Sequence, residues 1–227
     1  MGARSIAGLI LSLVCLSANA ATLNAVNRGW YCCGDFFGLP NGNYAVGDFD
    51  YVNNEVRNFL VYDLASVTGP VTEATLHLYS QSDGYVSPDP SETYTVFDVT
   101  TPIGDLTGGT GSPASTFADL GSGTVLGSVI ATAASNGTFI DIALNSSGLA
   151  YLNAHLGSLV AFGGALTTLG AIGPPHQEPP LEILFGRNRA GVMSDTQLLT
   201  AVPIPPAVWL FGSALGLIGV MRRKLSS

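Results

Sequence analysis

The 227-residue chain is poor in charge, because Asp, Glu, Lys and Arg together make up only 11% of it. This is less than half of the roughly 25% that soluble domains contain. Lysine occurs once, at Lys224, and the net charge is −8. An acidic chain lacks the basic surface that nucleic acids require. The composition therefore argues against nucleic-acid binding, and the 47% of hydrophobic residues are expected partly in targeting or membrane segments.

The sequence also lacks the short motifs of common catalytic sites. It has no G-x-S-x-G elbow, no H-E-x-x-H pair and no dinucleotide loop. Its three histidines, His77, His155 and His176, are far apart in sequence, and His77 and His155 are typical of structural or surface positions. We therefore predict no catalytic residue, no metal and no cofactor. A secreted hydrolase assembled from distant residues stays as a third functional hypothesis.

Cysteine is scarce, with only Cys15, Cys32 and Cys33 in the chain. Cys15 lies in a segment that we expect to be removed, which leaves two neighbouring cysteines. Because an ordinary disulfide separates its Cα atoms by about 5.5 Å, adjacent cysteines join only through a strained ring. Three states stay open for Cys32 and Cys33: a vicinal disulfide, an intermolecular bridge, or two unpaired thiols.

Residues 1–20 have the organisation of a secretory signal peptide. Arg4 supplies the positive charge, residues 6–16 form a short apolar core, and Ala18-Asn19-Ala20 is an A-x-A cleavage site. The apolar run is shorter than the ~20 residues that a membrane-spanning helix needs, which disfavours an uncleaved anchor. A lipoprotein at Cys15 is the other alternative. We predict cleavage after Ala20 by signal peptidase, following export through the Sec machinery.

Residues 202–227 form a second targeting segment with three parts. It starts at Val202-Pro203-Ile204-Pro205, continues through the uncharged residues 207–221, and ends in Arg222, Arg223 and Lys224. Basic residues after an apolar run stay on the cytoplasmic side. The run would form a single transmembrane helix of marginal length, since the hydrocarbon core is ~30 Å thick. The domain is therefore expected outside the membrane and the basic tail inside.

This tail closely resembles the PEP-CTERM sorting signal of Gram-negative bacteria. A proline motif, an apolar helix and an Arg-rich end occur in that order at the C-terminus, although Ile204 stands where the family has glutamate. The resemblance implies recognition by an exosortase and cleavage near Pro203, Ile204 and Pro205. It also implies release to the cell surface or the medium of bacteria that make exopolysaccharide.

Residues 21–201 remain as one extracellular domain. It contains four arginines and all sixteen acidic residues of the chain, so its net charge is −12. Its length suits a single buried core. Alternation of apolar and polar residues predicts strands, two of them half-buried, at residues 56–64 and 71–79. Shorter runs of the same kind lie at residues 94–99, 124–131, 139–144, 159–166 and 181–185.

Turns and one helix separate these strands. Asn136-Gly137 predicts a hairpin, and residues 107–115 are expected to be a loop. A short helix should begin at Asn145 or Ser146 and end at Gly157. Many short strands with Gly- and Pro-rich turns are typical of an all-β fold, so we predict an antiparallel β-sandwich of jelly-roll type.

Residues 58–80 resemble bacterial extracellular jelly-roll modules. In these modules a strand ending in a Phe/Tyr-Asp-Leu unit is followed by a short loop and an A-T-L-x-L-Y strand, here Ala74 to Tyr79. The resemblance implies a surface or carbohydrate-binding type of domain. It concerns the fold, so it indicates sugar binding only indirectly.

Aromatic and acidic residues supply the remaining candidate sites. Trp30 and Tyr31 beside Asp35 suit a glycan contact, while burial in the core explains these aromatics equally well. Asp48 and Asp50 should share one face of a strand, and a second acidic group lies further along, at Asp83, Asp89 and Glu92. Such loops offer oxygens to Ca²⁺, although a solvated acidic surface is the more common explanation.

The leading functional hypothesis is an exported, non-enzymatic envelope or matrix protein. It is sorted through its tail, anchored in the inner membrane as a precursor, and associated with exopolysaccharide or biofilm. The alternative is a carbohydrate-binding module that contacts matrix glycan through its N-terminal aromatics.

Overall fold

The computed structural model describes residues 18–32, 36–37, 42–49, 55–110, 113–170, 181–186 and 192–203. The chain divides into a compact unit, Ala20–Val202, and a second unit made of its two ends. Nearly all of both targeting segments lies outside the described residues. Within the described part of the chain, no helix is long and apolar enough to cross a membrane.

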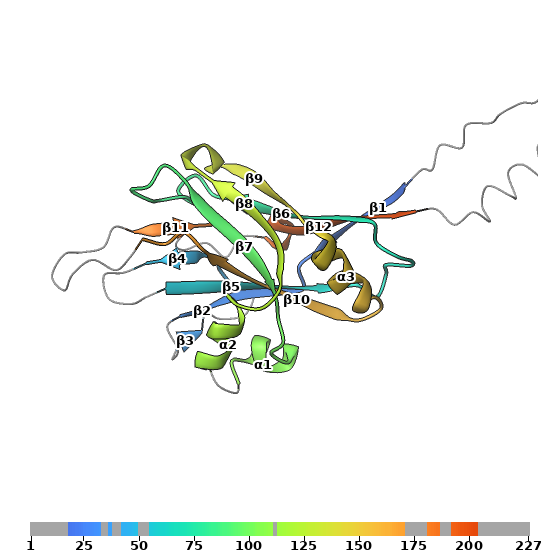
Figure 1. The fold of residues 1–227 in the computed structure, drawn as a ribbon. Helices are drawn as coiled ribbons and strands as arrows, with labels where there is room; N and C mark the ends of the chain where they lie inside the picture. The colour runs from blue at the N-terminus through green and yellow to red at the C-terminus, as the bar shows by residue number, and fades with distance from the viewer. Residues whose placement is uncertain are drawn as a thin grey trace, which may run out of the picture. The chain divides into compact units, whose positions relative to one another are not determined.

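The Ala20–Val202 unit is a sandwich of two antiparallel sheets, which confirms an all-β sandwich (Figure 1). Sheet A has the order β1-β12-β6-β9, with bounds Ala18–Asn24, Thr196–Pro203, Glu73–Ser80 and Thr138–Ala143. Sheet B has the order β11-β4-β5-β10-β7-β8, with bounds Glu182–Leu184, Val46–Asp48, Glu55–Asp63, Leu159–Leu166, Glu92–Asp98 and Val125–Ala131. Strand β2 (Asn27–Cys32) also pairs with β5 and with the short β3 (Phe36–Phe37).

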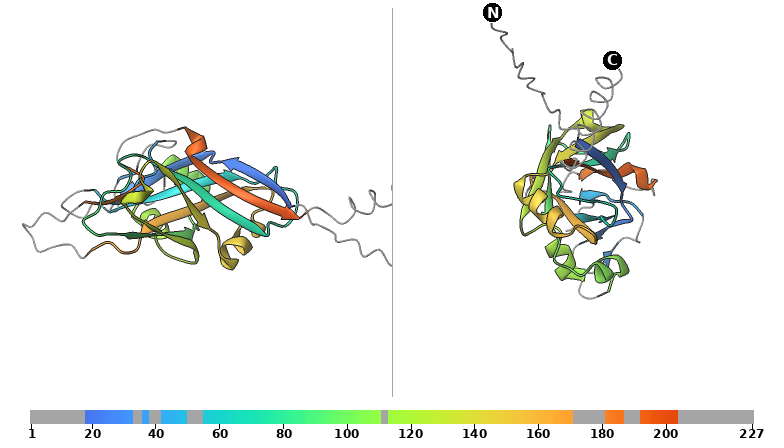
Figure 2. Two further views of the ribbon diagram at one scale, coloured as in Figure 1. Left: turned by 90° about the horizontal axis from the view of Figure 1, so that it is seen from above. Right: turned by 90° about the vertical axis from the view of Figure 1, so that its right-hand side faces the viewer.

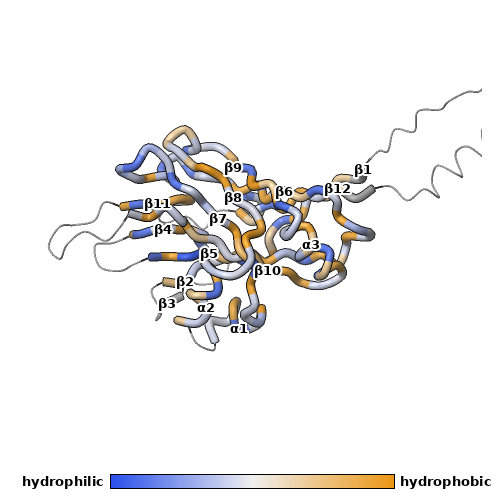
Figure 3. Tube along the Cα trace, in the orientation of Figure 1, coloured by the Kyte–Doolittle hydropathy of each residue, from blue (hydrophilic) through white to orange (hydrophobic). Residues whose placement is uncertain are grey.

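The main core lies between the two sheets and follows from the alternation of each strand. On β6, Ala74, Leu76 and Leu78 are buried, while the residues between them are half-buried. This confirms the half-buried strand predicted at residues 71–79. Leu60 and Tyr62 of β5 enter the same core from sheet B. Figure 3 shows hydrophobic residues along β7 and β10 in the middle of the molecule.

Two short helices cover the outer face of sheet B, so the prediction that β5 is buried on only one face is wrong. Helices α1 (Ile103–Gly108) and α2 (Pro113–Asp119) include the two ends of the segment 107–115 that was expected to be a loop, and the end view of Figure 2 shows both helices at one side of the sandwich. With Phe59, Val61 and other residues they form a second core. Strand β5 is therefore buried on both faces, not on one.

Sheet B and the residues after α2 approach each other very closely at Gly163 of β10. A Cβ added there would lie only 2.7 Å from the backbone oxygen of Leu120. Because that neighbour is backbone, it cannot rotate away as a side chain would. Because Gly163 has no side chain, the segment that follows α2 can pack directly against sheet B.

Helix α3 (Ser146–Ala154) confirms the predicted helix and its start. The Asn145 side chain accepts a hydrogen bond from the Gly148 N–H at 2.9 Å, as an N-cap residue should. The predicted Asn136-Gly137 hairpin is wrong, because β8 belongs to sheet B and β9 to sheet A. The 3₁₀ turn η1 (Ala133–Ser135) separates them, and Gly137, with φ of 71°, helps the chain change sheets.

Candidate functional site

Of the two N-terminal aromatics predicted to contact glycan, Tyr31 belongs to the hydrophobic core. Tyr31 is 1% exposed, its hydroxyl donates to the Leu106 carbonyl at 2.8 Å, and its ring lies 6.0 Å from that of Phe59. Trp30 is half-buried on β2, and Asp35 lies outside the described residues. The buried ring of Tyr31 offers no face to a sugar, so this residue acts in packing.

Cys32 is buried and takes part in a disulfide. The other two cysteines of the chain, Cys15 and Cys33, lie outside the described residues. Cys32 is therefore not a free thiol, which removes one of the three states left open by the sequence.

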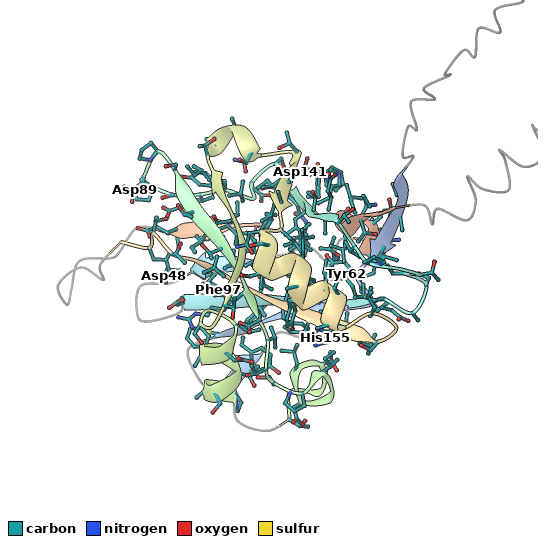
Figure 4. All side chains as sticks on the ribbon, turned by 45° about the vertical axis from the view of Figure 1, so that its right-hand side comes forward. Asp48, Tyr62, Asp89, Phe97, Asp141 and His155 are labelled. Atoms are coloured by element: carbon teal, nitrogen blue, oxygen red, sulfur yellow. The ribbon has the colours of Figure 1, made fainter. Side chains whose placement is uncertain are left out.

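Two carboxylates that are close in sequence, Asp89 and Glu92, meet a distant third, Glu182, at one end of the sandwich. Asp89, Glu92 and Glu182 each place an oxygen within 4.8 Å of the others. Figure 4 labels Asp89 and, at the same end of the molecule, Asp48. Glu92 and Glu182 are only 1% and 6% exposed. The sequence groups Asp89 with Glu92 but does not indicate Glu182, because the long-range bridge between Val86 and Ile183 brings β11 to this segment.

Neutral donors form hydrogen bonds to both buried carboxylates. Hydroxyls of Ser87 and Thr168 donate to the two Glu92 oxygens at 2.7 and 2.5 Å, and the Gly170 N–H donates to Glu182 at 2.7 Å. Oxygen ligands of this kind suit a hard cation. A group of acids whose oxygens also have protein partners does not define a metal site, and the expected absence of a metal stays a prediction.

The environment of Glu182 favours its protonated form. Burial raises the pKa of this carboxyl, and the Gly170 N–H partly opposes that effect. Nearby carboxylates raise the pKa further: Glu92, Asp89 and Asp48. Burial of the Glu182 carboxyl, together with repulsion from these acids, therefore weakens the fold as the pH rises and Glu182 ionises.

A different group of side chains lies on the outer face of sheet A, where β6 and β9 pair. The rings of His77 and Phe139 stack, with centroids 3.9 Å apart and planes only 6° apart. Tyr79 meets Phe139 edge-on at 5.2 Å. The His77 Nδ1 lies 2.5 Å from an Asp141 carboxylate oxygen. We call these four residues the aromatic platform; Figure 4 labels Asp141 on β9.

The two described histidines differ in chemistry. His77 and Asp141 form a His–Asp pair, but among the described residues no hydroxyl or thiol hydrogen-bonds to His77, so the pair has no partnered nucleophile there. His155, at the end of α3, lies against Tyr151 with its Nδ1 2.8 Å from the Tyr151 carbonyl oxygen. His155 thus has the structural role expected from the sequence. His176 lies outside the described residues.

The predicted processing residues fall at the limits of the sandwich or beyond them. Ala20 is the third residue of β1, and Val202 and Pro203 end β12. The remaining sorting residues lie outside the described part of the chain: Ile204, Pro205, Arg222, Arg223 and Lys224. No protein-family model matches the chain, and no curated protein matches it significantly.

Proposed function

We propose that the chain is an exported, non-enzymatic envelope or extracellular-matrix protein, sorted through its C-terminal segment. The observation that carries this proposal is the three-part tail that starts where the last strand of the sandwich ends. A proline motif at 203–205, an uncharged run at 207–221 and a basic end at 222–224 follow β12 without an intervening domain. The tail resembles a signal read by an exosortase, which is the partner that we propose.

The arrangement of the first and last strands supports processing at both ends. Strands β1 and β12 are neighbours in sheet A, and β1 begins at the end of the sandwich where β12 finishes (Figure 1). Cleavage after Ala20 would leave the pairing around Ala25, whose N–H donates to the Thr196 carbonyl at 2.9 Å. The two cuts would therefore leave the sandwich intact.

We further propose that the sandwich is of jelly-roll type, on the strength of the likeness of residues 58–80 to bacterial surface modules. Export by the Sec route, cleavage by signal peptidase and release near exopolysaccharide complete the proposal. Glycan binding is the second candidate function. The open aromatic platform of sheet A favours it, rather than the aromatics around Trp30.

Neutralising the basic end tests the sorting role of the tail. We expect the variant Arg222→Gln/Arg223→Gln/Lys224→Gln, expressed in a Gram-negative host with an exosortase, to lose most of the released protein. The physical reason is that without positive charge the tail is no longer held on the cytoplasmic side. Immunoblots of membrane and medium fractions measure this.

A matched control removes positive charge elsewhere. The variant Arg187→Gln/Arg189→Gln changes two arginines of the domain and should be released like the unaltered protein. Equal release of the tail variant and of this control would contradict a sorting function for residues 222–224.

A further inference from the structure

The aromatic platform leaves π-surface open to solvent. His77 covers one face of the Phe139 ring and Tyr79 meets its edge, yet Phe139 remains 41% exposed. Part of the Phe139 ring is therefore in contact with water. Two of these rings, His77 and Tyr79, come from β6 and the third from β9, so the pairing of these strands fixes the spacing of the platform.

The polar atoms of the platform are mainly hydrogen-bond acceptors. A carboxylate only accepts hydrogen bonds, so the Nδ1 that contacts Asp141 bears the proton and the Nε2 of a neutral His77 is left as an acceptor. The Asp141 side chain is 66% exposed, which makes its charge accessible. A ligand that pairs with Asp141 and with this Nε2 must therefore bring donors.

The charge of the surroundings indicates which donors. Residues 21–201 contain no lysine, and the two described arginines, Arg28 and Arg57, lie on β2 and β5 of sheet B. Glu73 is exposed on β6, the strand of His77. Aromatic faces are electron-rich and attract cations, and the carboxylate of Asp141 adds a charge-assisted hydrogen bond. This face thus complements a ligand with an ammonium group.

We propose that the aromatic platform binds a polysaccharide whose sugar rings carry free amino groups. A sugar ring lies against the exposed part of the Phe139 ring, and its ammonium group donates to Asp141. A second copy of this chain fits less well, because two domains of net charge −12 repel each other. The inference rests on the proposed matrix function only for the presence of a glycan around the protein.

A pair of probes that differ in whether the sugar amine is free or acetylated tests this directly. The full-length protein, purified in mild detergent at neutral pH, is titrated with a glucosamine oligomer and with the N-acetylglucosamine oligomer of the same length. We expect the glucosamine oligomer to bind, and the Kd of the acetylated oligomer to be higher by about fivefold or more. Equal affinity for both, or no binding of the glucosamine oligomer, would overturn the proposal.

Matched variants separate a specific site from general attraction to an acidic protein. Phe139→Ala and Asp141→Asn should each weaken glucosamine binding about fivefold or more. Asp83→Asn removes one exposed charge elsewhere and Ile130→Ala trims a more exposed side chain on β8; both should bind like the unaltered protein. If the control variants lose as much affinity for the glucosamine oligomer as Phe139→Ala and Asp141→Asn do, the attraction is non-specific and the proposed site is wrong. Fractionation of cells tests sorting separately, so the two proposals fail independently.

Discussion

The outer faces of the two sheets differ in what covers them. Sheet B presents Phe59 and Val61 outward, and α1 and α2 bury these residues under a second core. Sheet A presents Thr75, His77 and Tyr79 of β6 outward, and all three remain half-exposed. The top view in Figure 2 shows strands of sheet A without α1, α2 or α3 in front of them.

The alternation of apolar and polar residues along a strand thus determines which residues share a face of the sheet, but not whether other elements cover that face. Both β5 and β6 alternate, and in both the inward residues enter the main core. Phe59 and Val61, which β5 presents outward, are apolar, whereas the outward residues of β6 are mostly polar, so covering Phe59 and Val61 is favourable. The covered face therefore contributes to stability, and the open face is left for a ligand.

The largest expected effect is on the covered face. Leu106 of α1 is fully buried in the second core. We expect Leu106→Ala to lower the free energy of unfolding by about 2–5 kcal/mol, through lost burial and a cavity. Urea denaturation measures this loss. A decrease below about 1 kcal/mol would mean that the helices merely lie on sheet B without stabilising it.

A smaller effect should come from Asp119, at the end of α2. Its carboxylate accepts hydrogen bonds from the backbone N–H and hydroxyl groups of both Thr100 and Thr101, at 2.7–2.9 Å. We expect Asp119→Asn to cost about 1–2 kcal/mol at neutral pH, because an amide presents N–H groups to these donors and the site is partly solvated. Chemical denaturation at neutral pH measures this.

The same residue has a predictable pH dependence. Burial alone would raise the pKa of Asp119. The hydrogen bonds from Thr101 and Thr100 outweigh burial and bring this pKa below its ordinary value. The stability that its charge provides is therefore complete above the unfolded pKa of about 3.9 and is lost as the pH falls through the lower folded pKa. The gap between the unaltered protein and Asp119→Asn should shrink in acid. A constant gap, or an equal gap for Asp83→Asn, would speak against this assignment.

The smallest expected effect is on the open face. Phe139→Ala removes a partly exposed ring of sheet A, so the free energy of unfolding should change by only about 0.5 kcal/mol. Thermal unfolding beside Leu106→Ala gives the direct comparison. A loss as large as that of Leu106→Ala would show that the platform stabilises the fold and is not kept open for a ligand.

The sequence predicted features that depend on local chemistry. The alternation at residues 71–79, the Asn145 cap and the seven strands from residue 56 to residue 185 all correspond to described elements. The two ends of the loop predicted at residues 107–115 belong instead to α1 and α2, which form because apolar side chains such as Leu106 find a partner once β5 and β10 are in place. Asn136-Gly137 marks a turn, but long-range pairing sends its flanking strands to different sheets.

The candidate sites were less predictable, because they depend on register. His77 stacks on Phe139 only because β6 and β9 pair with Tyr79 opposite Phe139, and no local pattern indicates that pairing. Glu182 joins Glu92 for a similar reason. Strands β1 and β12 overlap the predicted targeting segments 1–20 and 202–227, so the sequence does not indicate them as strands.

The most direct test of the central claim is the intact mass of the protein, measured separately in the membrane fraction and in the medium of its native host. The account predicts a released species that begins at Ala21 and ends near Pro203, which would identify the β-sandwich as the mature protein. A protein found only in the membrane, with residues 204–227 still attached, would contradict sorting by the tail and make residues 207–221 a permanent anchor.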